Sequence, residues 1–181
     1  MIKLHDDIME PFHRVKTAVS LAQADAADMP LLYVNAGFEQ LTGYSSQQVV
    51  GQNCRFLQGA ETDPDAHVLI RNALGEIREI SICLLNYRAD GHPFHNLLVL
   101  SPMTDRNGRK LILGCQYDLQ NGLQSSEIDE HLRAVDGVIN RLTHVDIPQE
   151  PWRQSLKSFQ QRADSVKMLA MSYLNRASIA G

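Results

Sequence analysis

Apolar residues recur at helical spacing near both ends of the chain and form nearly continuous runs in its middle, so the hydrophobic pattern divides the 181 residues into three parts. In residues 1–20, this spacing predicts an amphipathic helix from about Ile2 to Ser20 that flanks the core. The apolar positions of this helix are Ile8, Phe12, Val15 and Val19.

The middle part, residues 21–119, is predicted to form one core domain that begins with short elements. An apolar strand at 31–34 leads into a brief helix that Gly43 interrupts. Ser45 or Ser46 caps a second brief helix, because serine side chains accept hydrogen bonds from free backbone N–H groups at a helix start.

A longer helix and three strands complete the core domain. Residues 62–64, Thr-Asp-Pro, supply an N-cap and a first-turn proline for a helix that runs to about Leu74. The three strands that follow are 79–87, 94–103 and 109–118, with Asp90-Gly91 and Asn107-Gly108 as hairpin signals between them. The pattern therefore predicts an antiparallel meander within an α+β fold.

The second and third strands of this meander are apolar at nearly every position, over residues 97–100 and 111–115. A sheet with one face in water would alternate apolar and polar residues, so both faces of this sheet are expected to be covered. A ligand can cover one face. The other face then requires the flanking helices, a second copy of the chain, or both.

The last part, residues 120–181, is predicted to form two helices with a break near 146–151. Their apolar residues follow heptad spacing: Ile128, Leu132, Val135, Ile139 and Leu142, then Trp152, Leu156, Phe159, Ala163, Val166, Ala170 and Tyr173. Residues 125–146 carry five acids and two bases, and residues 150–181 carry two acids and five bases, or −3 and +3. The two helices are either a hairpin packed on their own sheet or an oligomerisation surface.

Composition excludes several classes of protein. A net charge of −4 and a pI near 5.9 give no broad basic surface for nucleic acid or an anionic membrane. The acids at Asp6 and Asp7 do not fit a signal peptide, and no run reaches the length of a membrane span, so we expect a soluble cytoplasmic protein. Cys54, Cys83 and Cys115 are too widely spaced for a zinc site and odd in number for a disulfide framework, so we expect reduced thiols and no metal.

The segment Gly-Gln-Asn-Cys-Arg-Phe-Leu-Gln-Gly at 51–59 places one thiol between an amide and a guanidinium group. This nonamer resembles the signature of LOV (light-oxygen-voltage) domains, the blue-light branch of the PAS family. Further matches follow in chain order from about Pro30 to Asp118: Leu41-Thr42-Gly43-Tyr44-Ser45, Gly59 to Asp63, Leu85-Asn86-Tyr87, Asn96-Leu97, Pro102-Met103 and Gly114-Cys115-Gln116.

The resemblance implies a PAS fold, in which a five-stranded antiparallel sheet and a layer of helices enclose flavin mononucleotide (FMN). It also implies a photoreceptor rather than an enzyme, similar to short LOV proteins that have no separate effector domain. The expected output is a change in a homodimer formed through the outer sheet face and the flanking helices, or in binding to a downstream signalling protein. Direct nucleic-acid binding by the C-terminal helices is the less favoured interpretation.

Carried over residue by residue, the resemblance implies that Cys54 forms a reversible bond to flavin carbon C4a and that Gln116 relays the signal. Asn53 supports the thiol, Arg55 and Arg71 grip the phosphate, and Gln58 lies near the ribityl chain. Asn86, Asn96 and Gln116 match the amides that read the ring edge. Apolar and small residues complete the expected cofactor site: Leu57, Ile70, Leu98, Leu100, Ile112 and Gly114.

Strand alternation supports this assignment without the family, because Asn86, Asn96 and Gln116 each share a face with apolar or small neighbours two residues away. The same alternation puts Cys83 and Cys115 on the opposite face. Leu98 and Ile112 stand where many LOV domains have phenylalanine, and Ala22 stands where threonine is common, so altered photocycle kinetics are expected. A flavin-binding redox sensor and a PAS module without photochemistry remain the alternatives.

Overall fold

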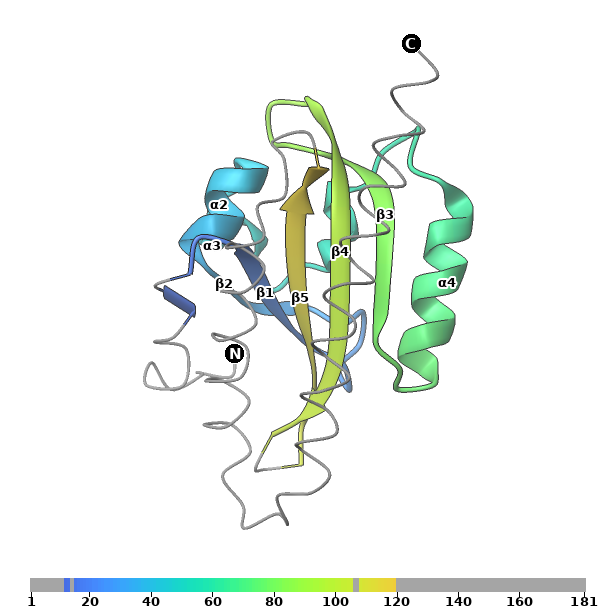
Figure 1. The fold of residues 1–181 in the computed structure, drawn as a ribbon. Helices are drawn as coiled ribbons and strands as arrows, with labels where there is room; N and C mark the ends of the chain where they lie inside the picture. The colour runs from blue at the N-terminus through green and yellow to red at the C-terminus, as the bar shows by residue number, and fades with distance from the viewer. Residues whose placement is uncertain (1–11, 14, 106–107, 120–181) are drawn as a thin grey trace.

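The computed structural model describes residues 12–13, 15–105 and 108–119. Within them lies a five-stranded antiparallel sheet of order β2-β1-β5-β4-β3 (Figure 1). The strands are β1 (Ala18–Gln23), β2 (Leu31–Val34), β3 (Ile80–Tyr87), β4 (Pro93–Thr104) and β5 (Lys110–Asp118). The predicted α+β class and the meander of β3, β4 and β5 are confirmed.

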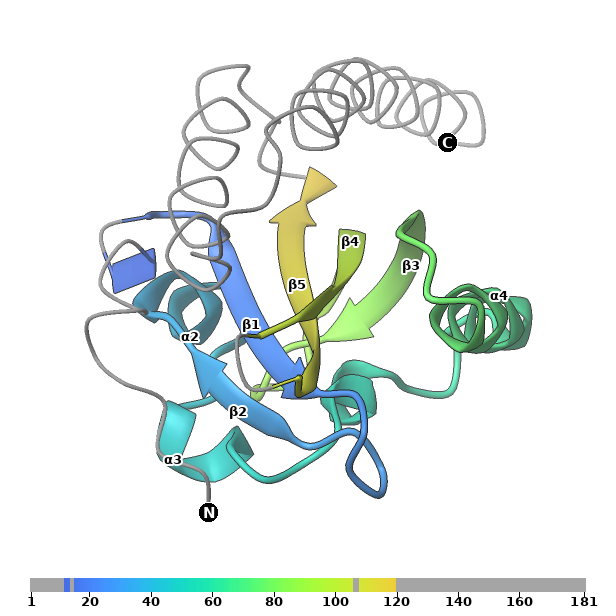
Figure 2. The same ribbon diagram turned by 90° about the horizontal axis from the view of Figure 1, so that it is seen from below.

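The described helices lie on one side of the sheet (Figure 2). They are α2 (Ala36–Thr42), α3 (Ser46–Val49), the 3-10 helix η1 (Cys54–Leu57) and α4 (Pro64–Gly75). Gly43 ends α2 with φ of 75°, a left-handed conformation that glycine adopts at little cost. Ser45 and Asp63 occupy the N-cap positions of α3 and α4, as the sequence predicts.

The predicted N-terminal helix is wrong at its C-terminal end, because Ala18, Val19 and Ser20 belong to strand β1. This strand pairs with β2 on one side and β5 on the other, and such long-range pairing outweighs the local helical spacing. The helix up to residue 11 lies outside the described residues. So do the two C-terminal helices predicted over 120–181, and the proposed domain boundaries near 20 and 119 remain predictions.

Asn35 joins the segment before β1 to the rest of the fold. Its side-chain oxygen accepts hydrogen bonds from the backbone N–H groups of Val19 at 2.8 Å and Phe38 at 2.9 Å. Its amide nitrogen donates to the carbonyl oxygens of Phe12, Val15 and Thr17 at 3.1, 3.2 and 2.9 Å. Asn35 is 2% exposed, so this buried amide is fully satisfied and fixes where β1 begins relative to α2.

The register assigns each strand residue to one of two faces, because directly paired residues share a face. Gln116 pairs with Ala18 and Leu98, and Asn96 pairs with Leu84. These residues lie on the inner face, toward α2, α3 and η1. Side chains of the outer face are also buried, among them Val19, Leu21, Leu97, Leu113 and Cys115. Both faces of the central strands are therefore covered, as the sequence predicts.

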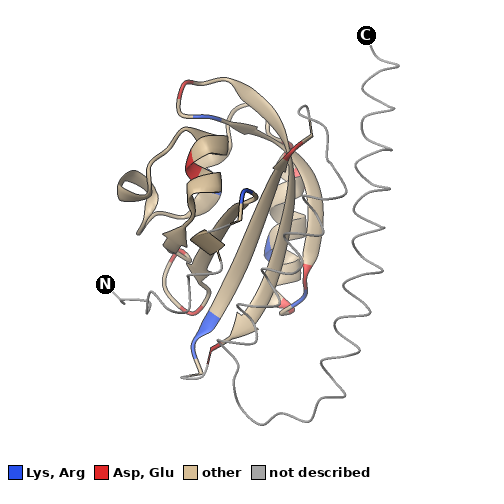
Figure 3. Ribbon diagram, turned by 60° about the vertical axis from the view of Figure 1, so that its left-hand side comes forward, with Lys and Arg blue, Asp and Glu red and all other residues tan. Residues whose placement is uncertain are grey.

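Charged residues lie mainly on helices, in turns and at strand ends (Figure 3). The strands β3 and β4 contain no Lys, Arg, Asp or Glu, and in β5 only the terminal Lys110 and Asp118 are charged. No described helix is long and apolar enough to cross a membrane.

Candidate functional site

Cys54 is the first residue of η1, where Asn53 provides the N-cap by accepting a hydrogen bond from the Arg55 backbone N–H at 2.9 Å. The thiol is partly buried against a cluster that includes Ala18, Leu31 and other apolar residues. Burial raises the pKa of Cys54 from 9.0 to about 12, because a thiolate would lose its hydration there. The sulfur is therefore a protonated thiol at neutral pH.

The segment around Cys54 is held by the chain that enters β2. The Leu31 backbone N–H donates to the Gln52 carbonyl and the Gly51 N–H donates to the Leu31 carbonyl, both at 2.8 Å. Asp28 contacts both neighbours of the cysteine. The Asn53 side-chain nitrogen donates to the Asp28 carbonyl at 2.6 Å, and Arg55 Nη1 pairs with Asp28 Oδ1 at 2.5 Å.

Sequence reasoning missed this role of Asp28. Its partners lie 25 and 27 residues further along the chain, so no local pattern connects them. Asp28 and Met29 both adopt positive φ, 64° and 45°, which only the structure reveals. Such backbone persists only where surrounding contacts hold it.

Asn86, Asn96 and Gln116 lie on the inner face of the sheet, as strand alternation predicts, and all three are at most 3% exposed. Asn96 Nδ2 donates to Asn86 Oδ1 at 2.7 Å, and Asn96 Oδ1 accepts from the Tyr117 backbone N–H at 3.3 Å. The side-chain amides of Asn86 and Asn96 are thus linked to each other, and Asn96 is also linked to the backbone of β5. The register confirms that Cys83 and Cys115 lie on the other face.

Two buried acceptors in the described part of the chain have no hydrogen-bond partner: Gln58 Oε1 and Gln116 Oε1. A buried polar atom without a partner is unfavourable, so its retention points to a ligand that offers N–H or O–H donors. A flavin has both kinds of donor, on its ring and on its ribityl chain. These two oxygens therefore fit the cofactor that the sequence implies.

The remaining predicted site residues are distributed over η1, α4 and the inner face. Leu57 is buried beside the Cys54 cluster, and Ile70 is half-buried on α4. Arg55 on η1 and Arg71 on α4 are exposed, as groups that meet a solvated phosphate would be. Leu98, Leu100, Ile112 and Gly114 share the inner face with Gln116.

Two glycines are required by close contacts at the site. A Cβ on Gly59 would lie 2.4 Å from Cε2 of Tyr87, so the end of the nonamer packs directly against β3. A Cβ on Gly114 would lie 2.6 Å from Ser20 Oγ and 3.3 Å from Gln116 Nε2. Ser20 is thus a site residue that the sequence prediction missed, because the predicted N-terminal helix included it.

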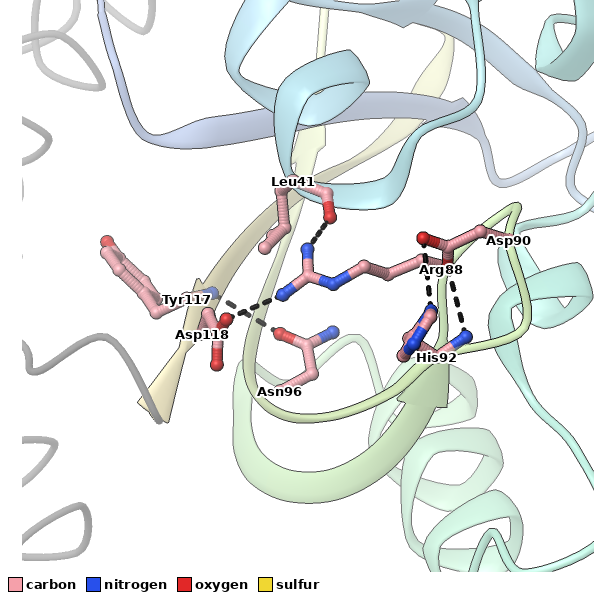
Figure 4. A network of polar contacts seen from close by, with 7 residues as sticks. All are labelled: Leu41, Arg88, Asp90, His92, Asn96, Tyr117 and Asp118. Atoms are coloured by element: carbon pink, nitrogen blue, oxygen red, sulfur yellow. Dashed lines mark hydrogen bonds and ion pairs between the residues drawn. The ribbon is translucent and has the colours of Figure 1, made fainter.

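Arg88 connects three parts of the fold near the end of β5 (Figure 4). Its Nη1 donates to the Leu41 carbonyl at the end of α2, and its Nη2 pairs with Asp118 Oδ2 at 2.6 Å. The guanidinium carbon also lies 4.6 Å from the centre of the Phe94 ring. This network lies two residues from Gln116 along β5.

Comparison with known proteins identifies this arrangement. The PAS domain profile matches residues 18–121, more than half of the chain, and the chain belongs to the PAS domain family. Within that family it is a LOV domain. The crystal structure of the Rhodobacter sphaeroides LOV protein superposes with a TM-score of 0.77 at 31% identity, covering 94% of this chain and 97% of that one.

Two curated relatives match over most of the described domain. The "Blue-light-activated histidine kinase 2" of Erythrobacter litoralis is 38% identical over 130 residues, which are 70% of this chain and 38% of that protein. "Phototropin-2" of Oryza sativa subsp. japonica is 41% identical over 123 residues, 64% of this chain and 14% of that protein. The match thus spans less than half the length of each of these relatives.

Proposed function

We propose that the chain is a blue-light photoreceptor that binds FMN and forms a reversible bond between Cys54 and flavin carbon C4a. The observation that carries the proposal is a partly buried thiol at Cys54, within a domain whose inner face holds an unpaired amide oxygen of Gln116. Its similarity to LOV domains of blue-light receptors supports the same function.

Binding is proposed to rest on three groups of residues. Arg55 and Arg71 hold the phosphate, since guanidinium groups donate two parallel hydrogen bonds to phosphate oxygens. Asn53 and Gln58 lie along the nonamer, where Asn53 supports the thiol and Gln58 serves the ribityl chain. Among the inner-face residues, Asn86, Asn96 and Gln116 meet the ring edge, while Leu57, Ile70, Leu98, Leu100, Ile112 and Gly114 surround its flat faces.

When bound, the flavin supplies absorption of blue light and an electrophilic ring carbon. Cys54 would supply both the sulfur and the proton of the proposed bond, since addition of a thiol across a C=N bond forms one C–S bond and one N–H bond and breaks one S–H bond. Electrons and atoms balance without an external oxidant. The high pKa of Cys54 keeps this proton on the sulfur until the reaction. The reverse step restores the thiol in darkness.

We propose that a change in the hydrogen bonding of Gln116 alters β5, and through β5 the residues that follow this strand. A changed hydrogen bond is worth about 1 kcal/mol, which shifts an equilibrium by only several-fold. The two states of the flanking segments must therefore differ little in free energy before illumination. We propose that a homodimer responds, through the outer sheet face and the flanking segments.

The role is proposed to be sensory rather than catalytic, with a downstream protein as a further partner, and we propose a cytoplasmic location. A redox sensor is the second candidate, because a reducible flavin also changes protonation at N5. Replacement of Cys54 separates the two, since a redox sensor does not need the thiol.

The test is the visible absorption spectrum of Cys54→Ala before and after blue illumination. We expect this variant to keep its yellow colour and to lose the reversible bleaching. Cys83→Ala is the matched control, because Cys83 lies on the outer face and should bleach as the wild type does. Reversible bleaching in Cys54→Ala would refute the proposed bond.

A further inference from the structure

The hydroxyl group of Ser20 lies against the amide proposed to relay the signal. Gln116 Nε2 donates to Ser20 Oγ at 3.1 Å, and Ser20 Oγ donates to the Gly114 carbonyl at 3.4 Å. Ser20 and Gln116 are 3% and 2% exposed, so water does not compete for these bonds. The other end of the amide, Gln116 Oε1, is buried without a partner.

These contacts give the amide a preferred orientation. With Nε2 toward Ser20, both the amide N–H and the serine O–H are used. If the amide turned over, Oε1 would face Ser20, and the single serine proton would have to leave Gly114 to reach it. The reversed orientation therefore has one hydrogen bond fewer.

We propose that Ser20 is a positioning residue for Gln116, holding the amide nitrogen so that Oε1 is the atom left for the ligand. This inference rests on the proposed function. A free acceptor suits the light state, in which the proton from Cys54 stands on flavin N5 and that site becomes a donor. Ser20 thereby prolongs the life of the bond that Cys54 forms.

The pairing of β1 with β5 brings the Ser20 hydroxyl close to the backbone of Gly114 and the amide of Gln116. Ser20 pairs directly with Gly114, where a Cβ would lie 2.6 Å from the serine oxygen. Ala18 and Ala22, the neighbours of Ser20 on this face, have no polar group to offer. Within the described residues, Ser20 Oγ is the group that accepts from the Gln116 amide.

The test is the rate of dark recovery after a blue pulse, with flavin content and thermal unfolding measured on each variant. We expect Ser20→Ala to shorten the lifetime of the bleached state by roughly two- to tenfold, the effect of one hydrogen bond. Ser20→Thr and Ser20→Val have the same shape, so their comparison isolates the hydroxyl. The Thr variant should recover slowly and the Val variant quickly.

A double-mutant comparison tests the route through the amide. In a Gln116→Leu background, Ser20→Ala should have no further effect, because the amide is gone. Ser101→Ala is the control, since Ser101 contacts Glu79 on the outer face and should leave recovery unchanged. An unchanged or longer lifetime in Ser20→Ala, or an effect that persists without Gln116, would overturn the inference. If the wild type never bleaches, the proposed function itself fails.

Discussion

Arg88 and Asp118 form an ion pair of 2.6 Å that fastens the end of β5 to the hairpin between β3 and β4. The side chain of Asp118 is 7% exposed and that of Arg88 is 24% exposed, so the pair is largely shielded from water. Because Gln116 lies on the same strand and the same face, the pair also sets the position of the strand that is proposed to report the photoreaction.

Arg88→Met should destabilise the fold, because it removes the ion pair between Arg88 and the shielded carboxylate of Asp118. We expect a loss of about 2 kcal/mol in the free energy of unfolding, measured by denaturant titration. Arg78→Met is the control. Its pair with Glu76 is about as short, at 2.6 Å, but more than half exposed, so the loss should stay below about 0.5 kcal/mol. Equal losses in the two variants would contradict this assignment.

The pKa of Cys54 predicts how stability changes with pH. Burial raises this pKa from 9.0 to about 12, so the folded state holds the thiol proton more tightly than the unfolded state. The stabilisation of the folded state that results from this pKa difference is fully present below about pH 9, and it is lost as the pH rises toward about 12. Unfolding free energies measured at increasing alkaline pH should fall less steeply in Cys54→Ala than in the wild type. Parallel curves would show that the thiol is not desolvated.

Asp28 and the ligand phosphate are expected to compete for Arg55. Asp28→Asn removes the charge that now pairs with Arg55, so affinity for FMN should rise relative to riboflavin, which has no phosphate. Since both side chains are more than half exposed, the gain should be modest, at most about fivefold. Fluorescence titration of the apoprotein with each flavin measures the ratio, and Arg55→Met should lower it. A ratio that does not respond to either change would show that Arg55 is not a phosphate ligand.

Leu98 and Ile112 stand on the inner face at positions where the resemblance to LOV domains implies phenylalanine, so we expect that introducing phenylalanine there changes dark recovery. Leu98 pairs directly with Gln116, and Ile112 pairs with Ala22. The measurement is the recovery rate of Leu98→Phe and Ile112→Phe. Val68→Phe, on the exposed side of α4, serves as the control. Recovery identical to the wild type in both inner-face variants would refute the prediction.

Elements whose boundaries depend on local sequence signals could be predicted from the sequence alone. Gly43 and Ser45 mark the end of α2 and the start of α3, and strand alternation places Asn86 and Gln116 each on one face with neighbours in its own strand. The pairing between strands then shows that the two faces are the same. Strand β1 was missed because Val19 continues the helical spacing of the residues before it. The segment is extended because it pairs with β2 and with β5, and the β5 partners of Ala18, Val19 and Ser20 lie more than 90 residues further along the sequence.

The same reason explains which site residues were missed. Ser20, Asp28 and Arg88 have ordinary sequence surroundings, and each acts through a partner distant in the chain. The thiol could be found because its neighbours Asn53 and Arg55 belong to one continuous motif. Contacts between motifs, such as Asp28 with both of those neighbours, require the fold.

The most direct measurement is the visible absorption spectrum of the purified protein, supplied with FMN, before, during and after blue illumination. The account predicts a yellow protein whose flavin band bleaches in the light and returns in darkness at a rate that Ser20 and Gln116 control. A colourless protein, or a yellow one that keeps its band under strong blue light, would contradict it.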